Sequence, residues 1–197
     1  NEGTMTADST DARVWIPIGI YETVRTLYAG SFDGQGHTVS GLYINDSAAE
    51  FVGMFGVVYG GTVKNVGVIN SYFNGDDNVG GVVGGNVQGT VLNCYNTGYV
   101  YGNAYVGGVV GIGEEGRIEY CYNIGAIGGD RYVGGVLGYD RQCTLGSLYY
   151  LDTCGASGGG YTRTAEQFAS GEIAYLLNAH NAAPAWFQLI GTDPMPT

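Results

Sequence analysis

The chain repeats itself at a fixed interval, and this repeat limits the folds open to it more than any other feature. Residues 78–96 read NVGGVVGGNVQGTVLNCYN, and residues 105–123 read YVGGVVGIGEEGRIEYCYN. One column of the repeat, spaced by 27 residues, comprises Val52, Val79, Val106 and Val133. A second comprises Phe55, Val83, Val110 and Leu137, to which a weaker copy at 29–34 adds Phe32. Such a period is typical of stacked repeats that bury a shared core.

The second half of each unit keeps two further positions apolar. The first of these columns comprises Val39, Val63, Val91, Ile118 and Leu145, and the second comprises Leu42, Val66, Cys94, Cys121 and Leu148. Because the neighbouring positions vary freely, the shared ones indicate side chains that point into a continuous core. Each unit also contains short β-branched runs separated by Gly, Asn and Asp, which is the chemistry of strands and turns.

These features predict an all-β fold, a right-handed parallel β-solenoid (β-helix) of about five coils over residues 27–153. Residues 1–26 lie outside the repeat. We expect them to form an N-terminal cap, because the open end of a solenoid needs cover. Three of their side chains are apolar enough to cover the first coil: Trp15, Ile16 and Ile18.

Residues 154–197 are expected to form a C-terminal cap. The sequence GASGGG at 155–160 predicts a flexible link, and 162–181 is the one stretch with helical character. Within it, Thr164 and Gln167 have the spacing of a helix capping box. The ending AWFQLIGTDPMPT predicts a final strand over the last coil.

Paired glycines interrupt the valine runs, as in VGGVVG at 79–84. Glycine weakens a strand, so its repetition needs a reason. We expect the reason to be geometric, because narrow coils bring backbones together where a Cβ atom would collide. A phosphate-binding loop is the alternative, but no helix follows these glycines and no Lys lies nearby.

Composition argues against several classes of partner. The formal net charge is −11 with seven Lys and Arg, so nucleic acid is not an expected partner. No run of 18 apolar residues exists, so no membrane insertion is expected. The cysteines form no C-x-x-C pair and the histidines no H-E-x-x-H, so neither a metal nor a cofactor is expected. Since Asn1 is not a start residue, we expect a mature chain or an excised domain.

The repeats resemble a known family. The units FDGQGHTVSGLYI, FVGMFG and NVGGVVGGNVQGTVLNCYNTGYVYG, with the flanking WIPIG and GEIAYLLN, are similar to the GLUG-motif repeats of bacterial exported proteins. That resemblance implies an extracellular or cell-surface location and a non-catalytic role in adhesion, spacing, or binding of a host or cell-surface glycan or protein. GLUG repeats also occur in IgA-cleaving peptidases, where the catalytic part lies elsewhere. An accessory, substrate-positioning domain of a larger secreted peptidase is therefore one alternative, and a carbohydrate-active β-helix enzyme is another.

A polar column precedes each VGG strand and comprises Asp76, Asn103 and Asp130. Carboxylates at this spacing suit glycoside hydrolysis or Ca²⁺ binding, but turns also favour Asp and Asn. We favour the turn interpretation and expect no catalytic residue. Asp33 and His37, within FDGQGHT, are likewise predicted to form a coil-opening turn rather than an acid–base pair.

Tyrosines give the best binding candidate. Tyr95, Tyr122 and Tyr149 directly follow an inward-facing column, so we expect them to face outward or lie at a corner. Tyr105 and Tyr132 form a second pair, with Asn78 in the preceding unit. Aromatic ladders stabilise a sheet, and they also form flat platforms for sugar rings or protein partners.

The four cysteines fall into two pairs. Cys94 and Cys121 occupy an apolar column, so we expect small buried side chains on adjacent coils and no bridge between them. Cys143 and Cys154 bracket a short segment outside this column. They are a possible disulfide in an oxidising compartment, and the sequence leaves both states open.

Overall fold

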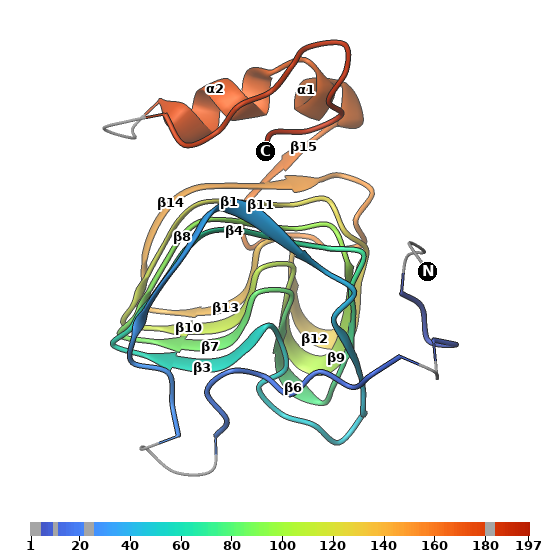
Figure 1. Cartoon of the computed structure of the whole chain (residues 1–197), viewed down its shortest axis with the longest axis vertical. Helices are drawn as coiled ribbons and strands as arrows, with labels where there is room; N and C mark the ends of the chain where they lie inside the picture. Colours follow the sequence, from blue (N-terminus) through green and yellow to red (C-terminus); the bar gives the residue numbers. More distant parts are fainter. Residues whose placement is uncertain (1–4, 10–11, 22–25, 180–183) are drawn as a thin grey trace.

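The protein is a β-solenoid of about four turns (Figure 1). The structure is a computed structural model that describes residues 5–9, 12–21, 26–179 and 184–197. Its parallel strands stack into three sheets, which are the walls of the coil. The predicted fold class is therefore confirmed, with about one coil fewer than expected.

Each wall takes one strand from each turn. Wall 1 is six-stranded and runs in the order β1 (Ser31–Ser40), β4 (Thr62–Ile69), β8 (Thr90–Asn96), β11 (Arg117–Asn123), β14 (Thr144–Leu151) and β15 (Tyr161–Arg163). Wall 2 contains β3 (Phe55–Tyr59), β7 (Val83–Val87), β10 (Val110–Glu114) and β13 (Leu137–Arg141). Wall 3 contains β2 (Tyr43–Asn45), β5 (Tyr72–Asn74), β9 (Tyr99–Gly107) and β12 (Ile127–Gly134), and β6 (Asp77–Gly80) also pairs with β9.

The register of the middle coils follows the 27-residue period. Val63 pairs with Val91, Val91 pairs with Ile118, and all three side chains are fully buried. Pairs of the other columns show the same stacking: Val66–Cys94, Cys121–Leu148, Val79–Val106, Val83–Val110 and Val110–Leu137. Burial of these apolar stripes is the main term that holds coil on coil. In the last coil Leu145 keeps the register but is 43% exposed, because no further coil covers it.

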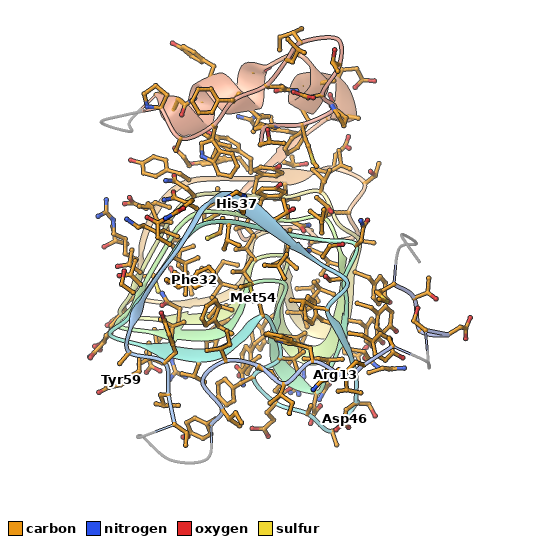
Figure 2. The ribbon with its side chains drawn as sticks, viewed as in Figure 1. Arg13, Phe32, His37, Asp46, Met54 and Tyr59 are labelled. Atoms are coloured by element: carbon orange, nitrogen blue, oxygen red, sulfur yellow. The ribbon has the colours of Figure 1, made fainter. Side chains whose placement is uncertain are left out.

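The first coil departs from the predicted columns. Phe32 pairs with Val63, His37 with Val66 and Val39 with Val68, so neither Val39 nor Leu42 occupies its predicted column. The reason is a bulge: four residues separate Asp33 from His37, opposite two residues of β4. FDGQGHT is thus part of strand β1 and not a coil-opening turn. Phe32 points into the interior of the solenoid, where Met54 also lies (Figure 2).

The glycine pairs have the predicted geometric role. A Cβ atom at Gly107 would overlap the carbonyl oxygen of Val110, where the chain turns from wall 3 into wall 2. A Cβ atom at Gly108 would overlap the side chain of Asn123, which is buried inside the coil. The first glycine therefore permits the corner, and the second leaves room for an internal polar side chain.

The N-terminal segment lies against the first coil, as predicted. The Trp15 N–H donates to the Tyr43 carbonyl and the Ile18 N–H donates to the Met54 carbonyl. Trp15 and Ile18 pack against the core, whereas Ile16 is 69% exposed and does not contribute to the cover. This edge is closed by isolated bridges rather than by full strands, which is one reason for the lower coil count.

The C-terminal segment covers the side of the solenoid rather than its end. Helices α1 (Ala165–Ala169) and α2 (Glu172–Asn178) lie outside wall 1 (Figure 1). The capping box of Thr164 and Gln167 is present. The predicted link is not free, because carbonyls of Gly158 and Gly159 accept hydrogen bonds from the last coil. The predicted final strand is absent from residues 184–197.

Candidate binding surface

The tyrosine ladder of wall 1 lies under the C-terminal segment. Tyr95, Tyr122 and Tyr149 project from the outer side of the sheet, but they are only 5%, 0% and 7% exposed. The Tyr95 and Tyr122 rings stack with centroids 4.9 Å apart, and Trp186 packs against both. The prediction that these three tyrosines form an accessible platform is therefore wrong.

Tyr122 fixes the cover in place. Its hydroxyl donates a 2.6 Å hydrogen bond to the carbonyl oxygen of Pro196, and Phe168 of α1 packs on its ring. Burial raises the pKa of the Tyr122 hydroxyl well above its ordinary value. The ladder is thus the second hydrophobic core of the protein, which joins wall 1 to the helices.

The other predicted pair does lie at the surface, and a third ring joins it. Tyr105 of β9 and Tyr132 of β12 stack with centroids 5.1 Å apart and an interplanar angle of 11°. Tyr139 of β13 packs edge-on to Tyr132 at 5.0 Å and lies 5.3 Å from Tyr105. Tyr132 is 53% exposed. We call Tyr105, Tyr132 and Tyr139 the tyrosine cluster.

The backbone of the cluster is conformationally costly. Tyr105 and Tyr132 have φ angles of 56° and 52°, in the left-handed region, and so does Asn78 one coil earlier at 61°. Asn accepts this region more readily than a bulky residue does. Local strain of this kind is common at functional sites, where the side chain compensates for it. The two tyrosines therefore stand where Asn would be easier to accommodate.

An ion pair lies beside the cluster. Arg141 Nη1 lies 3.1 Å from Glu114 Oε1, and both side chains are partly exposed. Glu114 raises the pKa of the Arg141 guanidinium, to which Tyr139 and Tyr105 make smaller contributions. Flat aromatic area beside hydrogen-bonding groups suits recognition of a sugar ring or a protein side chain.

Sequence reasoning missed Tyr139 and a further stack on wall 3. Tyr43, Tyr72 and Tyr99 stack with centroids 5.7 and 4.9 Å apart. The spacing of Tyr72 and Tyr99 is the repeat period, so a column search restricted to aromatic residues would have found them. Tyr139 follows the outward column position of Ile112 by the same interval, which is the signal that indicates it.

The predicted polar column exists as a ladder. Asn103 Nδ2 donates to Asp76 Oδ1 over 3.1 Å, and the Asn103 N–H donates to the Asp76 carbonyl over 2.7 Å. Asp130 is exposed at the equivalent position of the next coil. These contacts are those of a turn ladder, since an amide separates the two carboxylates. Among the described residues, no group of three or more His, Cys, Asp or Glu side chains could hold a metal ion.

All four cysteines are free thiols. Cys94 and Cys121 are fully buried on adjacent coils, as predicted. The possible bridge between Cys143 and Cys154 is not formed, because the two side chains pack against different parts of the core. Cys143 lies near Gly113, whereas the Cys154 carbonyl accepts a hydrogen bond from the Ile127 N–H. Burial raises the pKa of Cys143 to about 11.

Comparison with known proteins supports the fold. No family model matches the chain, so the resemblance to GLUG repeats stays a prediction. Halomucin from Haloquadratum walsbyi is 42% identical over 74 residues, which are 37% of this chain but 1% of halomucin. A proposed immunoglobulin A1 protease from Bacteroides ovatus matches with a TM-score of 0.52 at 20% identity. That match covers 95% of this chain and 81% of the other, and it extends to the fold alone.

No helix in the described ranges is both long and apolar enough to cross a membrane.

Proposed function

We propose that the chain is a non-catalytic β-solenoid module of an extracellular or cell-surface protein, and that it binds a glycan or protein partner through the tyrosine cluster. The observation that carries this proposal is Tyr132, a half-exposed aromatic ring held in a strained backbone conformation on a rigid wall. A rigid aromatic platform binds with little loss of conformational entropy. The similarity to halomucin and the resemblance to GLUG repeats support the location.

A second role is favoured by the structural neighbour. The Bacteroides ovatus protein is named for a protease activity, and its fold extends over nearly all of this chain. An accessory domain that positions substrate for a larger secreted peptidase would use the same surface for binding. The complete gene distinguishes the two, because a zinc-peptidase signature in the same reading frame supports the accessory role.

The binding proposal is tested on a glycan array and on immobilised mucin and fibronectin. Three proteins are compared: the wild type, the double variant Tyr132→Ala/Tyr139→Ala, and Tyr175→Ala as a matched control, since Tyr175 of α2 is 74% exposed and remote from the cluster. We expect the wild type and the control to bind at least one surface and the double variant to lose about tenfold or more in affinity.

Retention of full binding by the double variant, or no binding by the wild type, contradicts the proposal. Every bound glycan is also incubated with the protein and checked for cleavage products. Turnover of a bound glycan would contradict the non-catalytic assignment and support the carbohydrate-active alternative.

A further inference from the structure

A groove runs between the outer surface of wall 1 and the C-terminal segment, near the first coils. Its volume is about 580 Å³, which is within the range of small-ligand sites. It lies apart from the tyrosine cluster, which belongs to walls 2 and 3. The side chains that matter for its chemistry are Gln35, Asn65, Asn93, Tyr95, Trp186 and Phe187.

We propose that this groove, which we call the cap groove, binds a neutral oligosaccharide. Its described lining contains no Asp, Glu, Lys, Arg or His, although the chain as a whole carries a net charge of −11. Such a lining offers no compensation for a charged ligand. Side-chain amides on one side and aromatic rings on the other match the hydroxyl groups and the apolar ring faces of a sugar.

The amide side of the groove is ordered by a hydrogen-bond chain. Asn93 Nδ2 donates to Asn65 Oδ1, and Asn65 Nδ2 donates to Asp33 Oδ1, each over 2.9 Å. A primary amide has two N–H groups and two acceptor lone pairs. The Asn65 amide therefore has one further donor and one further acceptor for a ligand hydroxyl, in an orientation that Asp33 sets.

Asp33 also shapes the rim through the bulge in β1. Its Oδ1 accepts from the Gln35 N–H over 3.0 Å, and its Oδ2 lies 3.2 Å from Lys64 Nζ. The hydrogen bond from Asn65 is the main cause that lowers the pKa of Asp33, so this carboxylate stays ionised near neutral pH. β-bulges often re-aim side chains beside functional sites, and this one places Gln35 in the groove lining.

The aromatic side is held by the C-terminal segment. Asn178 of α2 donates to the Trp186 carbonyl over 2.7 Å and accepts from the Trp186 N–H over 3.1 Å. Phe187 and Thr197 exchange two backbone hydrogen bonds of 2.9 Å. Phe187 is thus fixed in position although 67% of it is exposed. Because both sides are ordered in the free protein, little conformational entropy is lost on binding.

An extended peptide fits this groove less well. Strands β4 and β8 each pair with a neighbour on both sides, so no open strand edge is available for β-strand addition. An anionic ligand would meet a single nearby cation, Lys64, which Asp33 already neutralises. The chemistry that remains is that of an uncharged polyhydroxyl compound.

The test uses four neutral tetrasaccharides as probes: maltotetraose, cellotetraose, mannotetraose and N-acetylchitotetraose. Tetragalacturonate serves as the charged comparator. Binding to the whole chain is measured by calorimetry and ligand-detected NMR at up to about 10 mM sugar, which covers weak affinities. We expect at least one neutral probe to bind and tetragalacturonate to bind at least about tenfold more weakly.

Variants locate the site. Phe187→Ala removes the exposed ring, and Asn65→Gly removes the amide while it preserves the left-handed backbone, for which φ is 54°. Each is expected to weaken binding about tenfold or more. Leu189→Ala is the matched control, since Leu189 is 64% exposed in the same segment and does not line the groove. Tyr132→Ala/Tyr139→Ala should leave sugar affinity at this site unchanged.

No binding of any neutral probe, or equal binding of tetragalacturonate, overturns the proposal. So does unchanged affinity in both groove variants. Binding that is lost in the tyrosine-cluster variant and kept in Phe187→Ala overturns the cap groove while it supports the proposed function, so the two failures are distinguishable.

Discussion

Asn96 and Asn123 occupy the same position in successive coils and are joined inside the core by a side-chain hydrogen bond of 2.9 Å, from Nδ2 of Asn96 to Oδ1 of Asn123. Both residues are 0% exposed. Each amide also bonds the backbone two residues on: Asn123 donates to the Gly125 carbonyl and accepts from the Gly125 N–H. The pair therefore satisfies a buried turn in two coils at once, which an apolar side chain cannot do.

Replacement of Asn123 by Ala is expected to lower the free energy of unfolding by about 2–3 kcal/mol, because it leaves the Gly125 groups and the Asn96 amide without partners inside the core. The matched control is Asn45→Ala, which removes the corresponding amide contact with Asn74 at the surface. That change should cost less than about 1 kcal/mol. Urea denaturation of the two variants decides the matter, and equal destabilisation would contradict a structural role for the buried pair.

Tyr122 and Tyr132 allow the same substitution to be made inside the second core and at the surface. Tyr122→Phe removes the hydrogen bond to the Pro196 carbonyl and should destabilise the protein by about 1–2 kcal/mol. Tyr132→Phe should change stability by less than about 0.5 kcal/mol. Thermal unfolding followed by circular dichroism measures both, and a Tyr122→Phe protein as stable as the wild type would show that the C-terminal cover is not held there.

Gly107 and Gly146 test the geometric role of the glycine pairs. Gly107→Ala forces a Cβ atom against the Val110 carbonyl, with an expected cost of about 1–3 kcal/mol or more. A Cβ atom at Gly146 meets only the side chain of Glu119, at 3.4 Å, so Gly146→Ala should be tolerated. Chemical denaturation of both variants provides the comparison. If Gly107→Ala were as stable as Gly146→Ala, the corner would have to be looser than described.

The repeated part of the molecule was predictable because every coil places a given residue in the same surroundings. Val63, Val91 and Ile118 can be recognised from spacing alone, since each faces the side chain one period away. The same logic fails at the first coil, where two extra residues before His37 displace the pairing and period counting cannot detect a bulge. Pairing of β1 with β4 therefore needed coordinates.

The burial of Tyr95 and Tyr122 was not predictable for a different reason. Their period and outward direction were correct, but the residues that cover them, Phe168 and Trp186, come from a segment with no repeat. Periodicity identifies which side of a sheet a residue occupies and not what packs on that side. The cap groove is formed by the same non-repeating segment, so the sequence gave no sign of it.

Alkaline pH should destabilise the protein. Burial raises the pKa of Cys143 from 9.0 to about 11, so the fold favours the neutral thiol. A raised pKa contributes stability that is complete below the unfolded value and is lost as pH rises toward the folded value. We therefore expect a constant Tm up to about pH 8.5 and a decline between pH 9 and 11, with a shallower decline in Cys143→Ala. A Tm that stays level or rises across this interval would contradict the burial of the thiol.

The binding role of the tyrosine cluster is tested most directly by amide NMR of the 20.6 kDa chain during titration with the glycan or glycoprotein fragment that the array retains most strongly. We predict that the largest shifts occur at Tyr105, Tyr132 and Tyr139 and on the adjoining strands β9, β12 and β13, while the amides of Tyr95 and Tyr122 change little. Shifts that centre elsewhere and leave these strands unaffected, or an array that retains no compound, would contradict it.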